Sequence, residues 1–384
     1  MAEKSAHVLV LAVVGLISLG MVMLLSTSSF VTDRADVFYD VRRQVAWLLI
    51  GVSACVLMAS VDYHWWGRTA WWWFAGACLL LGLCYVPGIG MRVNGSARWI
   101  GGKSFGLPGM TVQPSEFAKL AVLFLLARWL TVHKAESSTF LRGFLYPLLL
   151  AGIPIGLIAF EIDIGTAALI STMAVAVVFI AGARIKFIAA AALTTLGAVG
   201  LAIYHHPNRL ERFIAFMDLE KHKLGLGQQQ FRAQLAFGEG GLWGMGIGEG
   251  REKLMYMSYA HTDFIFPMVG EELGLVGSMA VVFTYVLIAV FGILIATQAP
   301  DRFGKLLGFG VVGMICLQAA INIGVTTAVL PNKGLPLPFV SYGGSNLLVC
   351  LIGVGLLLNI YRQGQEPSEE AYPRILKRKI TPRV

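Results

Sequence analysis

The feature that most constrains this fold is a series of about ten apolar stretches, each near the length that crosses a lipid bilayer. A transmembrane helix needs about 20 predominantly apolar residues, because the hydrocarbon core of a membrane is about 30 Å thick. The stretches fall at 7–29, 43–61, 70–87, 115–131, 143–160, 163–183, 186–204, 264–296, 305–330 and 342–361. They predict an all-α integral membrane protein, a bundle of about ten transmembrane helices.

Composition supports the membrane class. Charged residues make up only 14% of the chain and hydrophobic residues 57%, with a mean hydropathy of +0.71, whereas soluble domains are about 25% charged. Basic residues of membrane proteins mostly mark cytoplasmic loops, so the net charge of +8 predicts no nucleic-acid partner. The five cysteines lie in apolar stretches without metal-ligand spacing, which favours buried free thiols.

The short loops predict the orientation of the bundle. With a cytoplasmic N-terminus, the inner loops carry a series of basic residues: Arg68, Lys134, Arg142, Arg184, Lys186, Arg302 and Lys305. Two long segments, 88–114 and 205–261, then lie outside, and the second of these joins the seventh and eighth helices. We therefore expect one polytopic domain over 1–361 and a basic cytoplasmic tail over 362–384, with both termini cytoplasmic.

The first outer segment collects positive charge, against the usual bias of external loops. It continues into a predicted helix start, and residues 88–120 include Arg98 and Lys119 but only one acid, Glu116. Such a cluster favours an anionic ligand at the outer face. Two plainer interpretations stay open: Glu116 and Lys119 form a local ion pair on a capped helix, and Trp99 anchors the chain at the membrane surface.

The stretch "HTDFIFPMVGEELG" places Asp263 where the eighth helix is expected to begin. A carboxylate at the membrane surface, walled by apolar residues, is suited to act as a general base, and His261 and Thr262 are placed to orient it. On a continuous helix, Gly270 and Gly274 share the face of Asp263, and small residues there allow close helix packing or leave a groove. The alternative role for Asp263 is an N-cap.

The second outer segment carries glycine at every second position from Gly244 to Gly250. No strand precedes these glycines, so they do not form a dinucleotide-binding fingerprint. A loop that lies close over a substrate or another backbone fits better. Deeper along the eighth stretch, Glu271 and Glu272 are acids within an apolar helix, and intramembrane acids need hydrogen-bonding or cationic partners.

Several long motifs in a fixed order extend over nearly the whole chain. The strongest are "NGSARWI", "VQPSEFAKL", "AFGEGGLWGMGIGEGREKL", "HTDFIFPMVGEELGLVG" and "LPLPFVSYGGS". Through them the chain resembles the SEDS family (shape, elongation, division and sporulation) of bacterial cell-wall polymerases, the RodA/FtsW proteins. The loop motifs look more like the division branch than the elongation branch.

The resemblance implies an inverting peptidoglycan glycosyltransferase in the bacterial inner (cytoplasmic) membrane. Its substrate, both donor and acceptor, would be lipid II, a disaccharide-pentapeptide on an undecaprenyl diphosphate carrier. The implied partners are a class B penicillin-binding protein transpeptidase and other divisome proteins. Two other classes stay open: a lipid II flippase, and a scaffold without chemistry.

The resemblance also assigns roles to residues. The essential acid of the family falls on Asp263. Together with the residue patterns above, the expected substrate-binding set is Arg98, Trp99, Glu116, Lys119, His261, Thr262, Lys333 and Ser341. The expected structural and gating set is Asp163, Glu271, Glu272, Gly270 and Gly274.

One motif departs from the family, and the metal question stays open. Where the family usually has "QPDLGT", this chain reads "EIDIGT", which retains Asp163 but brings Glu161 and Ile162 in place of Gln-Pro. The sequence holds no dense carboxylate cluster, so it predicts no certain cofactor. A divalent cation, Mg or Mn, that bridges the diphosphate and an acid remains an expectation without assigned ligands.

Overall fold

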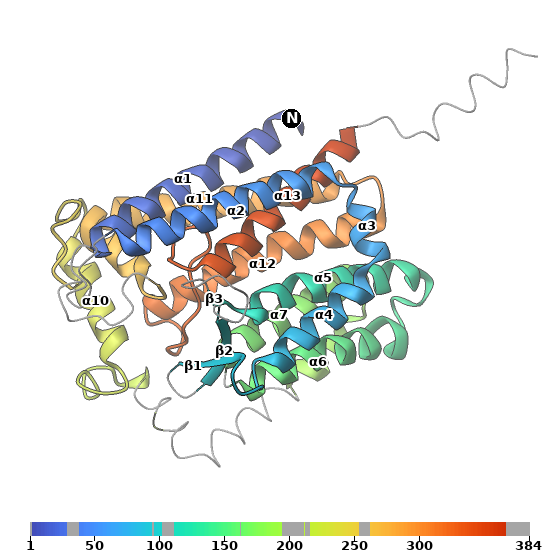
Figure 1. Cartoon of the computed structure of the whole chain (residues 1–384), viewed down its shortest axis with the longest axis horizontal. Helices are drawn as coiled ribbons and strands as arrows, with labels where there is room; N and C mark the ends of the chain where they lie inside the picture. The colour runs from blue at the N-terminus through green and yellow to red at the C-terminus, as the bar shows by residue number, and fades with distance from the viewer. Residues whose placement is uncertain are drawn as a thin grey trace, which may run out of the picture.

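The helices run alongside one another as a bundle, with a small β-sheet and one further helix gathered at one end (Figure 1). The computed structural model describes residues 2–28, 38–93, 96–101, 111–161, 163–193, 211, 216–252 and 262–365. α1 begins and α13 ends at the end of the bundle opposite the sheet (Figure 1). We call the end that carries the strands the sheet end.

The main helices of the bundle form along the apolar stretches of the sequence. They are α1 (Ala2–Ser28), α2 (Tyr39–Ser60), α4 (Ala70–Leu83), α5 (Pro114–Val132), α6 (Tyr146–Phe160, extended by a π-turn over Leu141–Leu145), α7 (Ile164–Ile180), α11 (Ile265–Thr297), α12 (Arg302–Thr326) and α13 (Gly344–Gln365). Short α3 (Tyr63–Arg68) joins α2 to α4, and α10 (Gln228–Gly240) precedes the glycine-rich segment.

Each of these nine long helices coincides with a predicted apolar stretch. Among the described residues, six helices are long and apolar enough to span a membrane, and α4 and α7 are shorter apolar helices. α5 is 19 residues long but carries Glu116, Lys119 and Arg128. The stretch at 186–204 lies mostly outside the described residues. The prediction of an all-α membrane bundle is confirmed.

A three-stranded antiparallel sheet was not predicted. Strands β1 (Gly90–Val93), β2 (Ser96–Gly101) and β3 (Thr111–Val112) pair in the order β1-β2-β3. The sheet lies between α4 and α5 in the chain, and Trp99 of β2 faces Met91 of β1 in the register. It places Arg98 at the sheet end of the bundle.

Polar side chains inside the bundle satisfy the open ends of helices. The amide nitrogen of Asn359 in α13 donates to the carbonyls of Met58, Ala59 and Val61, at 2.6–3.0 Å. These carbonyls belong to the C-terminal end of α2, which has no further helical turn to bond them. The buried amide therefore fixes α13 against α2.

α11 is broken nine residues after it starts. Gly274 has φ of 70° and ψ of −168°, a backbone conformation that is essentially restricted to glycine. The segment over residues 240–252, which we call the glycine-rich loop, fills the open turn. Four backbone hydrogen bonds of 2.9–3.2 Å join them: Met245 N–H to Glu271 O, Gly246 N–H to Glu272 O, Leu275 N–H to Gly241 O, and Val276 N–H to Leu242 O.

The break corrects the expected stripe of small residues. Gly274 is not helical, so it does not continue the face that Asp263 and Gly270 would share on one straight helix. The side chain of Phe237 occupies the space beside Gly270, and the glycine-rich loop occupies the space beside Gly274. The small residues therefore admit protein backbone and side chain rather than leaving a groove.

Gly274→Ala is expected to destabilise the junction of α11 and the loop. A methyl group there would lie 2.5 Å from the carbonyl oxygen of Leu242, and an alanine in this conformation adds about 1–3 kcal/mol of strain. We expect a lower thermal midpoint and faster proteolysis within residues 240–252. Gly313→Ala in α12 is the matched control, because no heavy atom lies within 4 Å of its added methyl. Equal midpoints for the two variants would contradict the prediction.

Candidate active site

Asp263 lies two residues before α11, at the sheet end, with a side chain that is partly exposed. Its carboxylate lies directly against the backbone of Gly334, in the segment that joins α12 to α13. It does not cap α11: the N-cap is Phe264, and no side-chain cap bond forms. The carboxylate is therefore not engaged in capping that helix.

The backbone at Thr262 and Asp263 is held by a side chain of α12 and by one from the segment that joins α12 to α13. Ser341 Oγ donates to the carbonyl of Thr262 at 2.5 Å and accepts from the N–H of Leu337 at 2.8 Å. Asn322 Nδ2 in α12 donates to the carbonyl of Asp263 at 2.8 Å. The predicted role of Ser341 in substrate binding is untested, and its hydroxyl here orders the chain at Thr262.

Asp163 and Arg98 place opposite charges near Asp263. Asp163 caps α7, accepting from the N–H of Thr166 at 3.2 Å and from its hydroxyl at 2.9 Å. Arg98 Nε donates to the backbone carbonyl of Glu161 at 3.3 Å. In the "EIDIGT" motif of this chain, the retained Asp163 is therefore the N-cap of α7.

The surroundings of Asp263 shift its acidity toward neutral pH. Burial raises the pKa of Asp263 from 3.8 to about 6; the negative charge of Asp163 acts in the same direction, and Arg98 opposes it. Such a pKa suits a general base, which must be ionised at working pH yet still hold a proton.

Glu161 is a further buried acid next to the site. Only 2% of it is exposed. Within the described part of the chain, no nitrogen or hydroxyl donor bonds its carboxylate oxygens, and the weak donor Cys84 lies beside them. Burial and the charge of Asp163 raise the pKa of Glu161 to about 8, although Arg98 lowers it. The protonated form of this side chain is therefore favoured near neutral pH.

Glu116 and Lys119 lie inside the bundle rather than on the outer surface. Lys119 Nζ is 2.6 Å from Glu116 Oε2, and both residues are buried. Lys119 also donates to Gln318 Oε1 in α12 at 2.7 Å, and Glu116 accepts from Asn346 Nδ2 in α13 at 2.9 Å. Their predicted contact with substrate is untested, and the pair ties α5 to two other helices.

Glu271 and Glu272 hold the glycine-rich loop. Glu272 accepts from the hydroxyl of Ser26 at 2.6 Å and from the N–H of Gly248 at 3.0 Å. One oxygen of Glu271 accepts from the backbone N–H groups of Arg251 and Glu252. These intramembrane acids are therefore bonded to protein, and the bond to Ser26 links the loop to α1.

The remaining predicted residues lie close to the site or outside the described part. Lys333 directly precedes Gly334 and is partly exposed, as is Trp99 on β2. His261 lies outside the described residues. The residues that the sequence did not single out are Asn322, Gly334 and Glu161; an amide within the apolar stretch at 305–330 was the available signal for Asn322.

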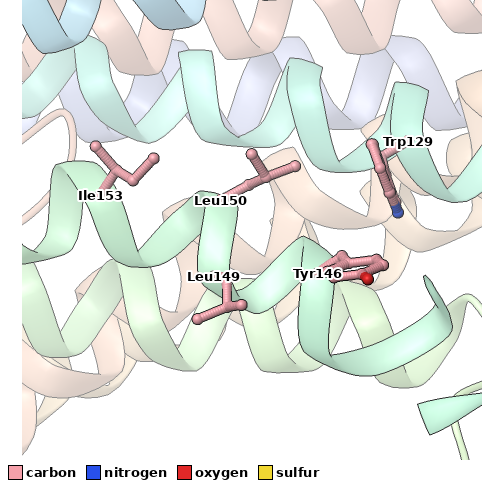
Figure 2. A pocket seen from close by; sticks show the side chains of 5 residues that line it. All are labelled: Trp129, Tyr146, Leu149, Leu150 and Ile153. Atoms are coloured by element: carbon pink, nitrogen blue, oxygen red, sulfur yellow. The ribbon is translucent and has the colours of Figure 1, made fainter. Parts of the chain in front are cut away.

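A shallow apolar pocket lies away from these residues (Figure 2). It is lined by Trp129 of α5 and by Tyr146, Leu149, Leu150 and Ile153 of α6. Among the residues that the structure describes, no acidic or basic side chain lines it. The candidate site therefore remains the cluster around Asp263.

The fold defines a polytopic membrane protein, with the cluster of charged side chains around Asp263 at one end of its bundle. A family profile described as "cell cycle protein", FTSW_RODA_SPOVE, matches residues 7–366. The chain belongs to this FtsW/RodA/SpoVE family, as its motifs predicted.

Named relatives extend the comparison. The chain is 36% identical over 360 residues to a probable peptidoglycan glycosyltransferase FtsW from Geobacter metallireducens, which covers 93% of this chain and 95% of the relative. A solved structure described as a peptidoglycan synthase complex that coordinates polymerization and crosslinking matches with a TM-score of 0.77 and 28% identity, over 94% of this chain and 98% of the other. The crystal structure of the Thermus thermophilus rod shape determining protein RodA gives a TM-score of 0.66 and 27% identity, over 94% and 97%.

Proposed function

We propose that this protein is a peptidoglycan glycosyltransferase that polymerises lipid II into β-1,4 glycan strands, with Asp263 as general base. One observation supports Asp263 as the base. Hydrogen bonds from Asn322 and Ser341 fix the backbone at Asp263 and Thr262, and the carboxyl group of Asp263 has a pKa of about 6. The family and the names of its relatives support the reaction class.

The reaction needs one base and a stabilised leaving group. Asp263 accepts the proton of the GlcNAc 4-hydroxyl of the acceptor as that oxygen attacks the anomeric carbon of MurNAc in the donor. The bond to the diphosphate breaks from the opposite face, which inverts an α-linked donor into a β-linked product. The diphosphate leaves with the electron pair, and Asp263 later returns its proton to water.

Cationic side chains near Asp263 suit the leaving group. Arg98 acts electrostatically on Asp263, and Lys333 is the neighbour of Gly334 in the chain. Fixed positive charge lowers the energy of a developing diphosphate anion. These roles extend the sequence-based assignments of both residues.

A divalent cation finds no ready set of protein ligands here. Within the described residues, no three His, Cys, Asp or Glu side chains gather so that they could hold a metal ion. Mg²⁺ commonly takes most of its ligands from phosphate oxygens and water. The expectation of Mg or Mn therefore remains a proposal about the substrate complex, and no step is assigned to it.

The proposed setting is the bacterial inner membrane during division, with both termini cytoplasmic. The first turn of α1 and the last turn of α13 lie at the same end of the bundle, which supports both termini being on one side of the membrane (Figure 1). A class B penicillin-binding transpeptidase is the proposed partner, supported by the match to a peptidoglycan synthase complex.

Purified protein with fluorescent lipid II separates polymerisation from transport. We expect a ladder of long products on a gel, and a muramidase should digest it. In parallel, vesicles carrying labelled lipid II in one leaflet report any transfer across the membrane. Transfer without glycan from well-folded protein would replace the polymerase with a flippase.

The rate of polymerisation is expected to rise with pH through about 6. Asp263 acts only when ionised, so below its pKa of about 6 kcat/KM should fall about tenfold per pH unit and above it reach a plateau. Arg98 lowers this pKa, so Arg98→Gln should move the midpoint upward. Initial rates at lipid II concentrations well below KM, from pH 4.5 to 8, test both statements, and a flat profile would contradict them.

A further inference from the structure

The carboxylate of Asp263 occupies space that is open because residue 334 is a glycine and has no side chain. Gly334 lies in the segment between α12 and α13, and a Cβ atom built on it would overlap Oδ2 of Asp263. The φ angle of Gly334 is outside the left-handed region that disfavours L residues. Alanine is therefore allowed by the backbone at this position, and the conflict is with the carboxylate alone.

A single amide links the two chain segments that meet here. Asn322 Nδ2 donates to the carbonyl of Asp263 at 2.8 Å and to that of Leu335 at 2.6 Å. The residue is 1% exposed, so neither bond competes freely with water. The amide of Asn322 thus fixes the distance between the backbone of Asp263 and that of Leu335.

The same segment is fixed on its other side. Gly165, in the first turn of α7, lies against Leu335, with a built Cβ only 3.4 Å from Leu335 Cγ. Gln318 donates to the carbonyl of Pro336 at 2.8 Å. The backbone after Gly334 therefore has little freedom to retreat from a bulkier residue, so the carboxylate is the group that must move.

We propose that Gly334 and Asn322 are positioning residues for Asp263. Gly334 leaves the space that the carboxylate occupies, and Asn322 fixes that space relative to the backbone of Asp263. The proposal rests on the role of Asp263 as general base. A general base misplaced by about 1 Å loses on the order of 10²-fold in rate, so a single methyl group at residue 334 reports directly on this geometry.

The test compares Gly334→Ala and Asn322→Leu with Gly313→Ala, whose added methyl meets no heavy atom within 4 Å. For Gly334→Ala we expect kcat for lipid II polymerisation to fall about 10- to 100-fold. We expect KM to change less than twofold and the thermal midpoint to match that of Gly313→Ala. Asn322→Leu keeps the number and branching of the side-chain heavy atoms but loses both donated bonds, and it should lower kcat in the same way.

The outcomes separate this inference from the proposed base. Wild-type kcat in Gly334→Ala, with Asp263→Asn inactive, would overturn the positioning role and leave the base intact. Activity in Asp263→Asn would remove the base, and the inference would fall with it. A lower thermal midpoint in Gly334→Ala, with normal kcat in the folded fraction, would show a purely structural role and also overturn the inference.

Discussion

Asp263→Asn is expected to lower kcat for glycan polymerisation by about 10²- to 10⁴-fold, the range for loss of a general base. Asparagine has the same size and keeps the backbone carbonyl that Asn322 bonds, but its amide cannot accept the proton of the acceptor hydroxyl. Binding of lipid II and the thermal midpoint should remain near wild type. Gel assays with purified protein, alone and with the transpeptidase partner, give the rate.

Glu161→Gln is the matched control for Asp263→Asn. The pKa of Glu161 is raised to about 8, which favours its protonated form at pH 7, so a neutral amide of equal size is expected to change little. Its rate should stay within a fewfold of wild type. Full activity in a folded Asp263→Asn would remove the general-base mechanism and favour a scaffold or transport role.

Lys119→Met is expected to destabilise the bundle by about 3–5 kcal/mol, the cost of leaving one partner of a buried ion pair uncompensated. Glu116 would keep its bond from Asn346 but lose Lys119, and Gln318 would lose its donor. We expect a strongly lowered thermal midpoint in detergent and little folded protein. A change below about 1 kcal/mol would show that water or lipid headgroups already screen the pair.

The double variant Glu116→Gln/Lys119→Met separates the ion pair from packing. With both charges of this pair removed, most of the lost stability should return, because a neutral pair does not suffer the same desolvation. A double-mutant cycle on thermal unfolding measures the coupling energy. Equal losses in the single lysine variant and the double variant would assign the effect to packing around α5.

The helices could be predicted from the sequence because the length of an apolar run is a local property. α6 was predicted at 143–160 and ends at Phe160, and α12 was predicted to start at 305 and begins at Arg302. The break in α11 could not be predicted in this way. It depends on hydrogen bonds from the glycine-rich loop, which lies more than 20 residues earlier in the chain.

The residues of the candidate site could be predicted only where an ionisable side chain stands out from an apolar stretch of sequence. Asp263 stood out as an acid at the start of an apolar stretch. Asn322 and Gly334 did not, because their importance lies in contacts between α12, the segment after it and Asp263. Glu116 and Lys119 were expected at the outer face, but α5 is enclosed by α12 and α13 from its first turns, so both lie within the bundle.

The buried ion pair also constrains how the chain is made. α5 enters the membrane early in synthesis, yet the partners that complete its charges lie far downstream: Gln318 is 199 residues beyond Lys119, and Asn346 is 230 residues beyond Glu116. Until α12 and α13 emerge from the ribosome, Lys119 lacks its bond to Gln318 and Glu116 lacks its bond from Asn346. Biogenesis of this bundle therefore ends with the C-terminal helices closing around a helix inserted long before them.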